Sequence, residues 1–301
     1  MGKRLTFWFF LTFFVVALCF PVSAETETSS SSFTVIVLPD TQGYSDSHPE
    51  IFRSQTSWIS ENNQKLNIKL VVHLGDVVEH PESVEEWRRA KEAMDTLEEK
   101  EVTALMAFGN HDYTTLGEER AKNPFNEYFP VSRYGNSILS GTYRTDSADN
   151  VFVAFEEGGQ RYLFLTVEYR PREEVLAWAN GVLEGHPEHL AVIVTHSYMW
   201  ANGFRTSSGD DIWHGLAKKH SNVRMVLCGH VPGAGVEADY GENGNKVTQI
   251  LSNYQYYSNG GNGFLRIMTF YPEEGKVRVR TYSPYLDSYK SNEANEFTVG
   301  S

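Results

Sequence analysis

The sequence predicts an α/β fold, because short buried strands alternate with longer amphipathic segments. Five apolar or β-branched runs of five or six residues each end in a polar or glycine-containing loop, which is typical of buried strands. Helical patterns separate these runs, so the order of elements is that of βαβ units. The chain has 301 residues, of which 41% are hydrophobic and 22% are charged. This composition excludes disorder, and a chain of this length can bury a sizeable core.

The expected elements follow in order along the chain. Strands are expected at residues 33–38, 69–74, 103–108, 191–195 and 223–227. Helices are expected at 50–62, 84–100, 171–183 and 210–220, where Ser83 and Glu86 form a capping box before the second and Pro171 opens the third. Two pairs of runs, 151–156 with 162–168 and 264–271 with 276–282, flank glycine-containing turns and indicate β-hairpins. The architecture is therefore α/β repeats with antiparallel additions.

The N-terminus has the pattern of a secretory signal peptide. An apolar stretch at residues 5–20 follows Lys3 and Arg4, and small residues suited to a signal-peptidase cut end at Ala24. The stretch is too short to span a bilayer comfortably. We therefore expect residues 1–24 to be a signal peptide, 25–32 a flexible polar lead-in, and 33–301 one domain. The mature chain would be secreted or periplasmic with no membrane span; an uncleaved N-terminal anchor is the alternative.

The charge balance disfavours nucleic acid as a partner. The chain carries 26 Lys and Arg against 39 Asp and Glu, a formal net charge of −13, and residues 1–24 contain Lys3 and Arg4 but no acid. A field of this sign repels polyanions at long range. A cation bound in a cleft can reverse the sign locally, so the composition is compatible with a protein that binds metal ions.

Polar side chains follow each of the five expected strands. Ligands in α/β folds bind beyond the carboxyl ends of strands, so we expect these side chains at one edge of the sheet. Their oxygen and nitrogen atoms suit Mn, Zn or Fe, and a carboxylate such as that of Asp76 can bridge two cations. His111 would face a substrate oxygen as hydrogen-bond donor or general acid, with Asp112 orienting it. The five segments are Asp40-Thr41-Gln42, Gly75-Asp76, Gly109-Asn110-His111-Asp112, His196 and Gly229-His230.

These segments, in this order, resemble the signature of calcineurin-like metallophosphoesterases, and in particular a secreted branch in which Gln follows the first Asp. The resemblance implies a four-layer α/β/β/α sandwich of mixed sheets, with two divalent metal ions (Mn, Zn or Fe) between the sheets. It also implies hydrolysis of a phosphate ester, as a phosphatase or phosphodiesterase, by metal-activated water. Carried over by position, the second-metal ligands are Asn110, His196 and His230, the bridge is Asp76, and Asp40 and Gln42 belong to the first metal.

Two positions depart from the family pattern, and both affect the first metal. Gln42 stands where most members have His, and Pro232 stands where they have the last His of Gly-His-x-His. Three interpretations follow. Gln42 can supply an oxygen to a weaker first site, completed by water or by a group such as His48, His80 or Asp239. Alternatively only the second metal binds tightly, and one cation with His111 carries the reaction. In the third interpretation the protein is a catalytically weak metal- or ligand-binding surface protein on the same fold.

The motifs do not specify the ester, its class as monoester or diester, the metal or the oligomeric state. The same ligand set accepts several divalent ions, and availability decides between them.

Overall fold

The computed structural model describes residues 1–2, 32–114, 123–134 and 139–300. The expected signal peptide at 1–24 and lead-in at 25–32 therefore lie almost entirely outside the described residues and stay predictions. Within the described ranges, no helix has both the length and the apolar character needed to cross a membrane.

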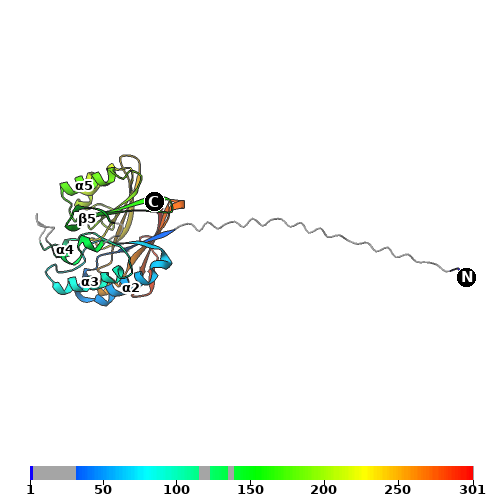
Figure 1. Ribbon diagram of the computed structural model, residues 1–301, viewed down its shortest axis with the longest axis horizontal. Coiled ribbons are helices and arrows are strands. Elements are labelled where there is room, and N and C mark those ends of the chain that lie inside the picture. Colours follow the sequence, from blue (N-terminus) through cyan, green and yellow to red (C-terminus); the bar gives the residue numbers. More distant parts are fainter. Residues whose placement is uncertain (3–31, 115–122, 135–138, 301) are drawn as a thin grey trace.

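Two mixed sheets form the centre of the molecule (Figure 1). The first has the order β13(Ser288–Lys290), β12(Lys276–Ser283), β11(Leu265–Tyr271), β1(Phe33–Leu38), β2(Ile68–His73) and β3(Ala104–Met106), and β14(Glu296–Gly300) also pairs with β12. The second has the order β4(Leu139–Arg144), β5(Ser147–Glu157), β6(Gln160–Val167), β7(Leu190–Thr195), β8(Val223–Cys228), β10(Lys246–Asn253) and β9(Gly233–Tyr240). Strands β1, β2 and β3 are parallel, as are β6, β7, β8 and β10.

Helices cover both sheets. The α-helices are α1(Gln42–Ser47), α2(Pro49–Leu66), α3(Val84–Glu98), α4(Pro124–Tyr128), α5(Glu173–Glu184), α6(Ser207–Gly215) and α7(Ser258–Gly261). Short 3₁₀ turns lie at η1(Asn110–Asp112), η3(Val131–Tyr134), η4(Ala217–Lys219) and η5(Pro272–Glu274). In Figure 1, α2 and α3 lie on one side of the paired sheets and α5 lies on the other. The predicted four-layer α/β/β/α arrangement is confirmed.

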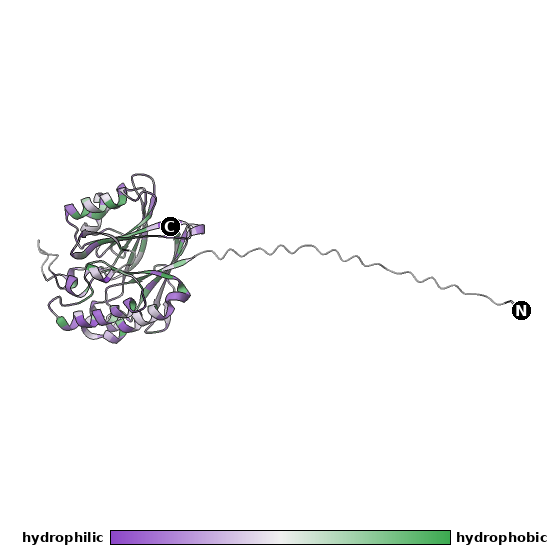
Figure 2. Ribbon diagram, viewed as in Figure 1, coloured by the Kyte–Doolittle hydropathy of each residue, from purple (hydrophilic) through white to green (hydrophobic). Residues whose placement is uncertain are grey.

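Alternating side chains of the second sheet explain the layers. In β6, Phe164 belongs to the core between the sheets, whereas its neighbours Leu163 and Leu165 belong to a second core with α5 and α6. Successive side chains of a strand point to opposite faces, so both faces of this sheet are buried. Between the sheets, the ring of Phe33 lies 4.9 Å from that of Tyr162. The hydropathy colours show the same pattern, with apolar residues on the strands and polar residues on the outside of the helices (Figure 2).

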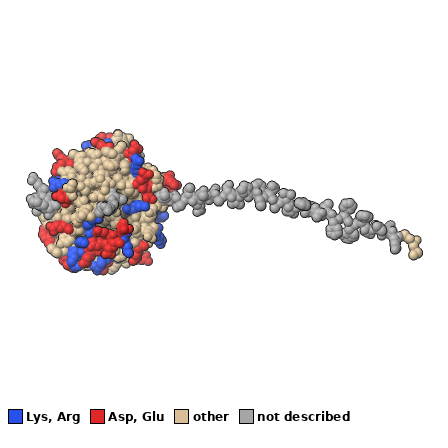
Figure 3. Space-filling model, in the orientation of Figure 1, with Lys and Arg blue, Asp and Glu red and all other residues tan. Residues whose placement is uncertain are grey.

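The outer surface of α3 is charged, as a solvated helix face should be. Acidic and basic side chains are intermingled over the part of the surface where α3 lies (Figure 3). Arg88 pairs with Glu85 and Glu92, and Lys91 pairs with Asp95 at 2.6 Å. These pairs are spaced three or four residues apart, which places them on one helix face. They account for the mixed charges of this helix face.

One expectation is wrong: the five strand ends do not belong to one sheet. Strands β1, β2 and β3 are in the first sheet, and β7 and β8 are in the second. The hydrophobic pattern identifies a buried strand but not its partner. Each sheet also contains one of the two predicted hairpins: the first sheet includes β11, which pairs with β1, and the second includes β6, which pairs with β7.

Candidate metal centre

The loops that follow β2, β3, β7 and β8 bring four predicted ligands together. His196 is fully buried, and its Nε2 atom lies 3.1 Å from Asp76 Oδ2 and 3.1 Å from Asn110 Oδ1. His230 Nδ1 lies 3.1 Å from the same nitrogen. The ligand atoms of Asp76, His196 and His230 all lie within 4.8 Å of one another. A carboxylate, an amide oxygen and two imidazoles thus converge on one point, which is a suitable donor set for a transition metal.

The backbone at this point adopts conformations that ordinary residues avoid. Asp76 has φ 52° and His230 has φ 64°, both in the left-handed region. Such residues carry strain that the surrounding structure must hold, and they concentrate at functional sites. Gly109 allows the close approach, because a Cβ added there would lie 2.0 Å from Asp76 Oδ1. Any larger residue at position 109 would therefore collide with Asp76.

A backbone contact fixes which ring nitrogen of His196 faces the centre. Its Nδ1 atom lies 2.8 Å from the carbonyl oxygen of Leu74, which can only accept a hydrogen bond. Nδ1 therefore carries a proton, and Nε2 is the atom directed at Asp76 and Asn110. A metal-binding histidine is commonly oriented in this way, by a hydrogen bond from its other nitrogen.

The electrostatics of the centre follow from burial and from the Asp76–His196 contact. Burial alone would lower the pKa of His196, but the charge and hydrogen bond of Asp76, with the charge of Asp40, raise it to about 9. Burial would raise the pKa of Asp76, but His196 lowers it. Burial lowers the pKa of His230 to about 4, and the neighbouring charge of His196 adds to this effect. The two shifts favour a charged pair, with the Asp76 carboxylate ionised and His196 protonated.

Asp40 joins the centre from the end of β1. Its carboxylate accepts hydrogen bonds from the backbone N–H of His230 at 3.0 Å and from Asn253 Nδ2 at 2.8 Å. Burial and the negative charge of Asp76 hold its pKa well above the ordinary value, although His196 acts in the opposite direction. A nearby cation would favour its charged form. Asn253 was not predicted as a site residue, although it lies at a strand end like the other members, in this case that of β10.

Gln42 lies at the first turn of α1 and is 6% exposed. Its Nε2 atom donates a hydrogen bond to Glu79 Oε2. Its Oε1 atom is buried and has no hydrogen-bond partner among the described residues. The groups proposed to complete this half of the site are engaged elsewhere: His48 contacts Glu50, His80 contacts Glu86, and Asp239 contacts Arg205 and Gln249.

His111 lies beside Asp76, and the hydrogen bonds of Asp112 go to backbone groups and not to the His111 ring. The backbone N–H of His111 donates to Asp76 Oδ1 at 2.9 Å, and its Nδ1 donates to the carbonyl oxygen of Glu79 at 2.8 Å. Nε2 is then the ring atom that can meet a substrate. Asp112 is fully buried and instead accepts hydrogen bonds from the backbone N–H groups of Val77 and Gly109 at 2.7 and 2.8 Å. The expected contact between Asp112 and the His111 ring does not form, because the 3₁₀ turn directs these two neighbouring side chains differently.

The residues present fit divalent cations. Three buried carboxylates, those of Asp40, Asp76 and Asp112, lie in one region, and burial with the charge of Asp76 raises the pKa of Asp112 to about 7. The unpartnered Oε1 of Gln42, two residues after Asp40 in the chain, is a further buried oxygen donor. Buried charges and polar atoms of this kind require a partner, and a cation supplies one. The donor set is complete on the side of His196 and His230, and contains only oxygen on the side of Asp40.

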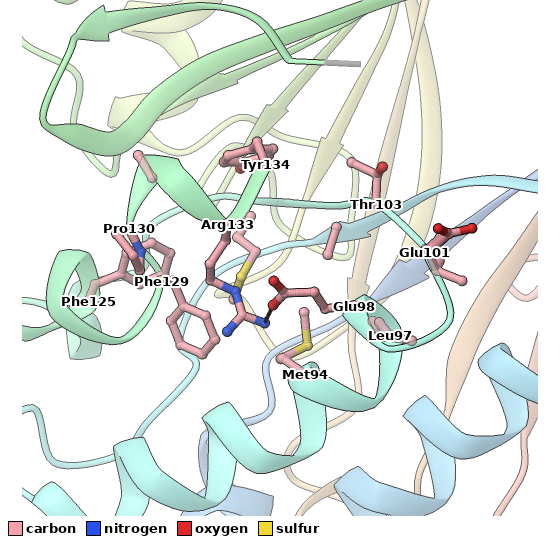
Figure 4. Close-up of a pocket in the computed structure, with 14 residues that line it drawn as sticks. Met94, Leu97, Glu98, Glu101, Thr103, Phe125, Phe129, Pro130, Arg133 and Tyr134 are labelled. Carbon is pink, nitrogen blue, oxygen red and sulfur yellow. Dashed lines mark ion pairs between the residues drawn. The ribbon is translucent and has the colours of Figure 1, made fainter. Parts of the chain in front are cut away.

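A separate cavity of about 490 Å³ lies between α3, β3, α4 and η3 (Figure 4). Apolar side chains such as Met94, Leu97 and Phe129 form much of its wall. Arg133 points into it but is paired with Glu98 and Asp95 at 3.0 and 2.6 Å. None of the predicted metal ligands lines this cavity, so it is distinct from the centre.

Comparison with known proteins relates this geometry to one family. Residues 33–234 match the family described as "Calcineurin-like phosphoesterase". The chain is 33% identical over 273 residues to "Uncharacterized protein YvnB" of Bacillus subtilis (strain 168), covering 88% of this chain and 21% of that protein. It therefore spans about a fifth of that relative's length. It is 23% identical over 226 residues to "Probable cyclic nucleotide phosphodiesterase" of Moraxella catarrhalis (strain BBH18), covering 68% of this chain and 73% of that one.

Two solved structures share the fold at low sequence identity. A purple acid phosphatase from yellow lupin (Lupinus luteus) seeds superposes with a TM-score of 0.60 and 12% identity, covering 90% of this chain and 54% of that one. GAP50, described as the anchor in the inner membrane complex of Plasmodium, superposes with a TM-score of 0.54 and 11% identity, covering 89% of each chain.

Proposed function

The chain belongs to the calcineurin-like phosphoesterase family, and from this premise we propose that it is an active hydrolase of phosphate esters that uses two divalent cations. The observation that carries the proposal is the convergence of Asp76, Asn110, His196 and His230, with His111 at its edge. The four side chains form a donor set suited to cations, and His111 adds a ring nitrogen that can meet a substrate.

The residues divide between two cation positions. Asn110, His196 and His230 would hold the second cation, Asp40 and Gln42 the first, and Asp76 would bridge them. When bound, the cations would supply a nucleophile from water at neutral pH and offset the charge of the phosphoryl group. Each of these side chains is already placed by a contact to the backbone or to a neighbouring polar group.

His111 supplies the remaining chemistry. Because Nδ1 donates to the carbonyl oxygen of Glu79, the ring is held with Nε2 available to the ester. A proton on Nε2 would stabilise or neutralise the oxygen of the departing alcohol, which is where negative charge develops. The backbone contact of His111 with Asp76 Oδ1 keeps the ring next to the cations.

We further propose that the protein is secreted or periplasmic, on the basis of the signal-peptide pattern at residues 1–24. Similarity to a protein described as a probable cyclic nucleotide phosphodiesterase makes phosphodiesters, including cyclic nucleotides, the first substrates to test. Phosphate monoesters should be tested beside them, so that the rates for the two classes of ester can be compared.

The test is steady-state hydrolysis of chromogenic phosphate monoesters and diesters and of a cyclic nucleotide. The purified chain is stripped of metal and titrated with Mn, Zn or Fe, with Asp76→Asn as the blank. We expect turnover that requires metal and is lost in the blank. No turnover with any metal, combined with retained metal binding, would overturn the proposal and favour a binding protein on the same fold.

A further inference from the structure

Glu79 contacts two residues of the metal centre although it occupies none of the predicted ligand positions. Its carboxylate accepts the hydrogen bond from Gln42 Nε2, and its backbone oxygen accepts the one from His111 Nδ1. It lies in the loop between β2 and α3, three residues after Asp76. Glu79 thus contacts both Gln42, the proposed ligand of the first cation, and His111, the histidine proposed to face the substrate.

The loop that carries Glu79 is held from two directions. At one end, the backbone N–H of Val77 donates to the buried Asp112 at 2.7 Å. At the other, the backbone N–H groups of Glu79 and His80 donate to Glu86 Oε2 at 2.8 and 3.0 Å. The side chain of Glu86 is only 5% exposed, so its charge is committed to these contacts. A loop fixed in this way presents the Glu79 carboxylate to Gln42 at a constant position.

Hydrogen-bond chemistry then decides which end of the Gln42 amide faces Glu79. An ionised carboxylate can only accept, so it takes the NH₂ group and turns Oε1 away from Glu79. That oxygen is buried without a partner among the described residues. Leaving a buried acceptor unpaired is unfavourable, and a bound cation would remove this cost. The arrangement therefore suits Gln42 Oε1 as a ligand of a cation, and without a cation this oxygen makes no hydrogen bond to the described residues.

We propose that Glu79 is a positioning residue that makes Gln42 an oxygen ligand of the first cation. The inference rests on the metal centre of the proposed function, since a cation must bind beside Asp40. If residue 79 were neutral and able to donate, the amide of Gln42 could turn round and direct its NH₂ group at the cation, which cannot bind it. Glu79 therefore allows an amide to serve at a position where most family members have an imidazole.

The first experiment counts bound Mn²⁺ in the wild-type chain, in Glu79→Gln and in Glu82→Gln. Glu82 is an exposed glutamate of the same loop, so its variant removes the same charge without touching Gln42. Free Mn²⁺ is followed by electron paramagnetic resonance during titration of the metal-free protein. We expect two Mn²⁺ in the wild type and in Glu82→Gln. In Glu79→Gln the affinity for the more weakly bound Mn²⁺ should fall by about 10- to 100-fold, as is usual when the hydrogen-bond partner of a metal ligand is removed.

A reversed pair separates positioning from a general effect on folding. In the double variant Gln42→Glu with Glu79→Gln, the amide at position 79 donates to the carboxylate at position 42, whose other oxygen still faces the cation. We expect the second Mn²⁺ to return in this double variant. Gln42→Glu alone, which places two carboxylates against each other, should bind it less tightly than the double variant.

Two results would overturn the inference. One is a wild-type chain that binds a single Mn²⁺, and the other is a Glu79→Gln variant with both affinities unchanged. Hydrolysis by a chain with one Mn²⁺ would leave the proposed function in place while the inference fails. Two Mn²⁺ sites that respond as expected, in a chain that cleaves no ester, would support the inference while the proposed function fails.

Discussion

The two halves of the metal centre differ in the chemistry of their donors. Around His196, a second imidazole, an amide oxygen and a carboxylate each lie 3.1 Å from its Nε2 atom. Beside Asp40, the donors are a carboxylate and the amide oxygen of Gln42, and both depend on neighbours, Asn253 and Glu79, for their orientation. Imidazole favours Zn and Fe, whereas oxygen donors favour Mn and Mg. Loss of imidazoles therefore changes which ion a site prefers and how tightly it binds, and does not by itself abolish the site.

Asp76 is the proposed bridge between the two halves, so its substitution should have the largest effect. Asp76→Asn removes the carboxylate that contacts His196 and receives the backbone N–H of His111. We expect turnover to fall by at least about 10³-fold, the upper range for loss of one preorganised electrostatic group. Metal content, measured by elemental analysis, should fall in both positions. The exposed Asp146→Asn is the control, and an Asp76→Asn protein that keeps two metals would contradict the shared role.

Ligand removal from each half tests the asymmetry directly. His196→Ala should lose the tightly bound cation and reduce turnover by about 10²-fold or more. Gln42→Ala should lose only the weaker cation, with a smaller drop in rate. Elemental analysis and rate measurements at one metal concentration give both readouts. If His196→Ala and Gln42→Ala lost equal amounts of metal and of activity, the two halves of the centre would not differ in their affinity for the cation.

His111 should matter for rate and not for metal. His111→Ala removes the ring but keeps the backbone N–H that contacts Asp76, so both cations should stay bound. We expect a loss of about 10²-fold in kcat, within the range for one general acid. The loss should be smaller for an ester with a good leaving group, which needs no proton. A variant with full activity toward a poor leaving group would remove His111 from the mechanism.

Much of this centre could be predicted from the sequence because its ligands follow buried strands. A run such as that of β7 is recognised locally, and the residue after it, His196, then falls at the ligand-binding edge. Glu79 could not be found in this way, because a lone Glu in a loop has many roles and only the orientation of its side chain toward Gln42 distinguishes them. Asn253 ends the buried strand β10 and was missed because residues 246–253 were not among the expected strands.

The assignment of each strand to one of the two sheets and the contacts of Asp112 could not be predicted from the sequence. Strand pairing depends on contacts between residues far apart, such as Val37 with Arg266. His111 and Asp112 are neighbours, so a contact between them is a reasonable expectation from spacing. In the folded chain, the 3₁₀ turn directs Asp112 to the backbone of Val77 and Gly109 instead.

The pH dependence of stability should separate the metal-free from the metal-loaded centre. The pKa of His196 is raised from 6.5 to about 9 by Asp76 and Asp40 against the opposing effect of burial. The folded state therefore holds a proton that the unfolded state releases near pH 6.5. The stabilisation is complete below pH 6.5 and is lost as the pH rises to about 9.

Thermal unfolding of the metal-free protein measures this effect. We expect its melting temperature to decrease between pH 6.5 and 9, and the raised pKa of Asp112, about 7, adds to the decrease at the lower end of the range. With saturating Mn²⁺ the cation replaces the proton on His196, so the decrease should disappear and the apparent metal affinity should rise with pH. Identical pH profiles with and without metal would show that His196 is not a ligand.

The smallest effect should come from restoring the common family residue on the weaker side. In Gln42→His, an imidazole replaces the amide, and the carboxylate of Glu79 can accept its second N–H, as carboxylates commonly do for metal-binding histidines. We expect the affinity of the first position for Zn to rise by about tenfold or less and that for Mn to change little, because nitrogen donors favour Zn. Competition titration with a chromogenic chelator measures both. Gln42→Asn, whose shorter amide reaches neither Glu79 nor the cation in the same geometry, is the control and should weaken both ions. A Gln42→His protein with reduced Zn affinity would mean that residue 42 does not face the first cation. The type of donor atom would then not explain the difference between the two halves.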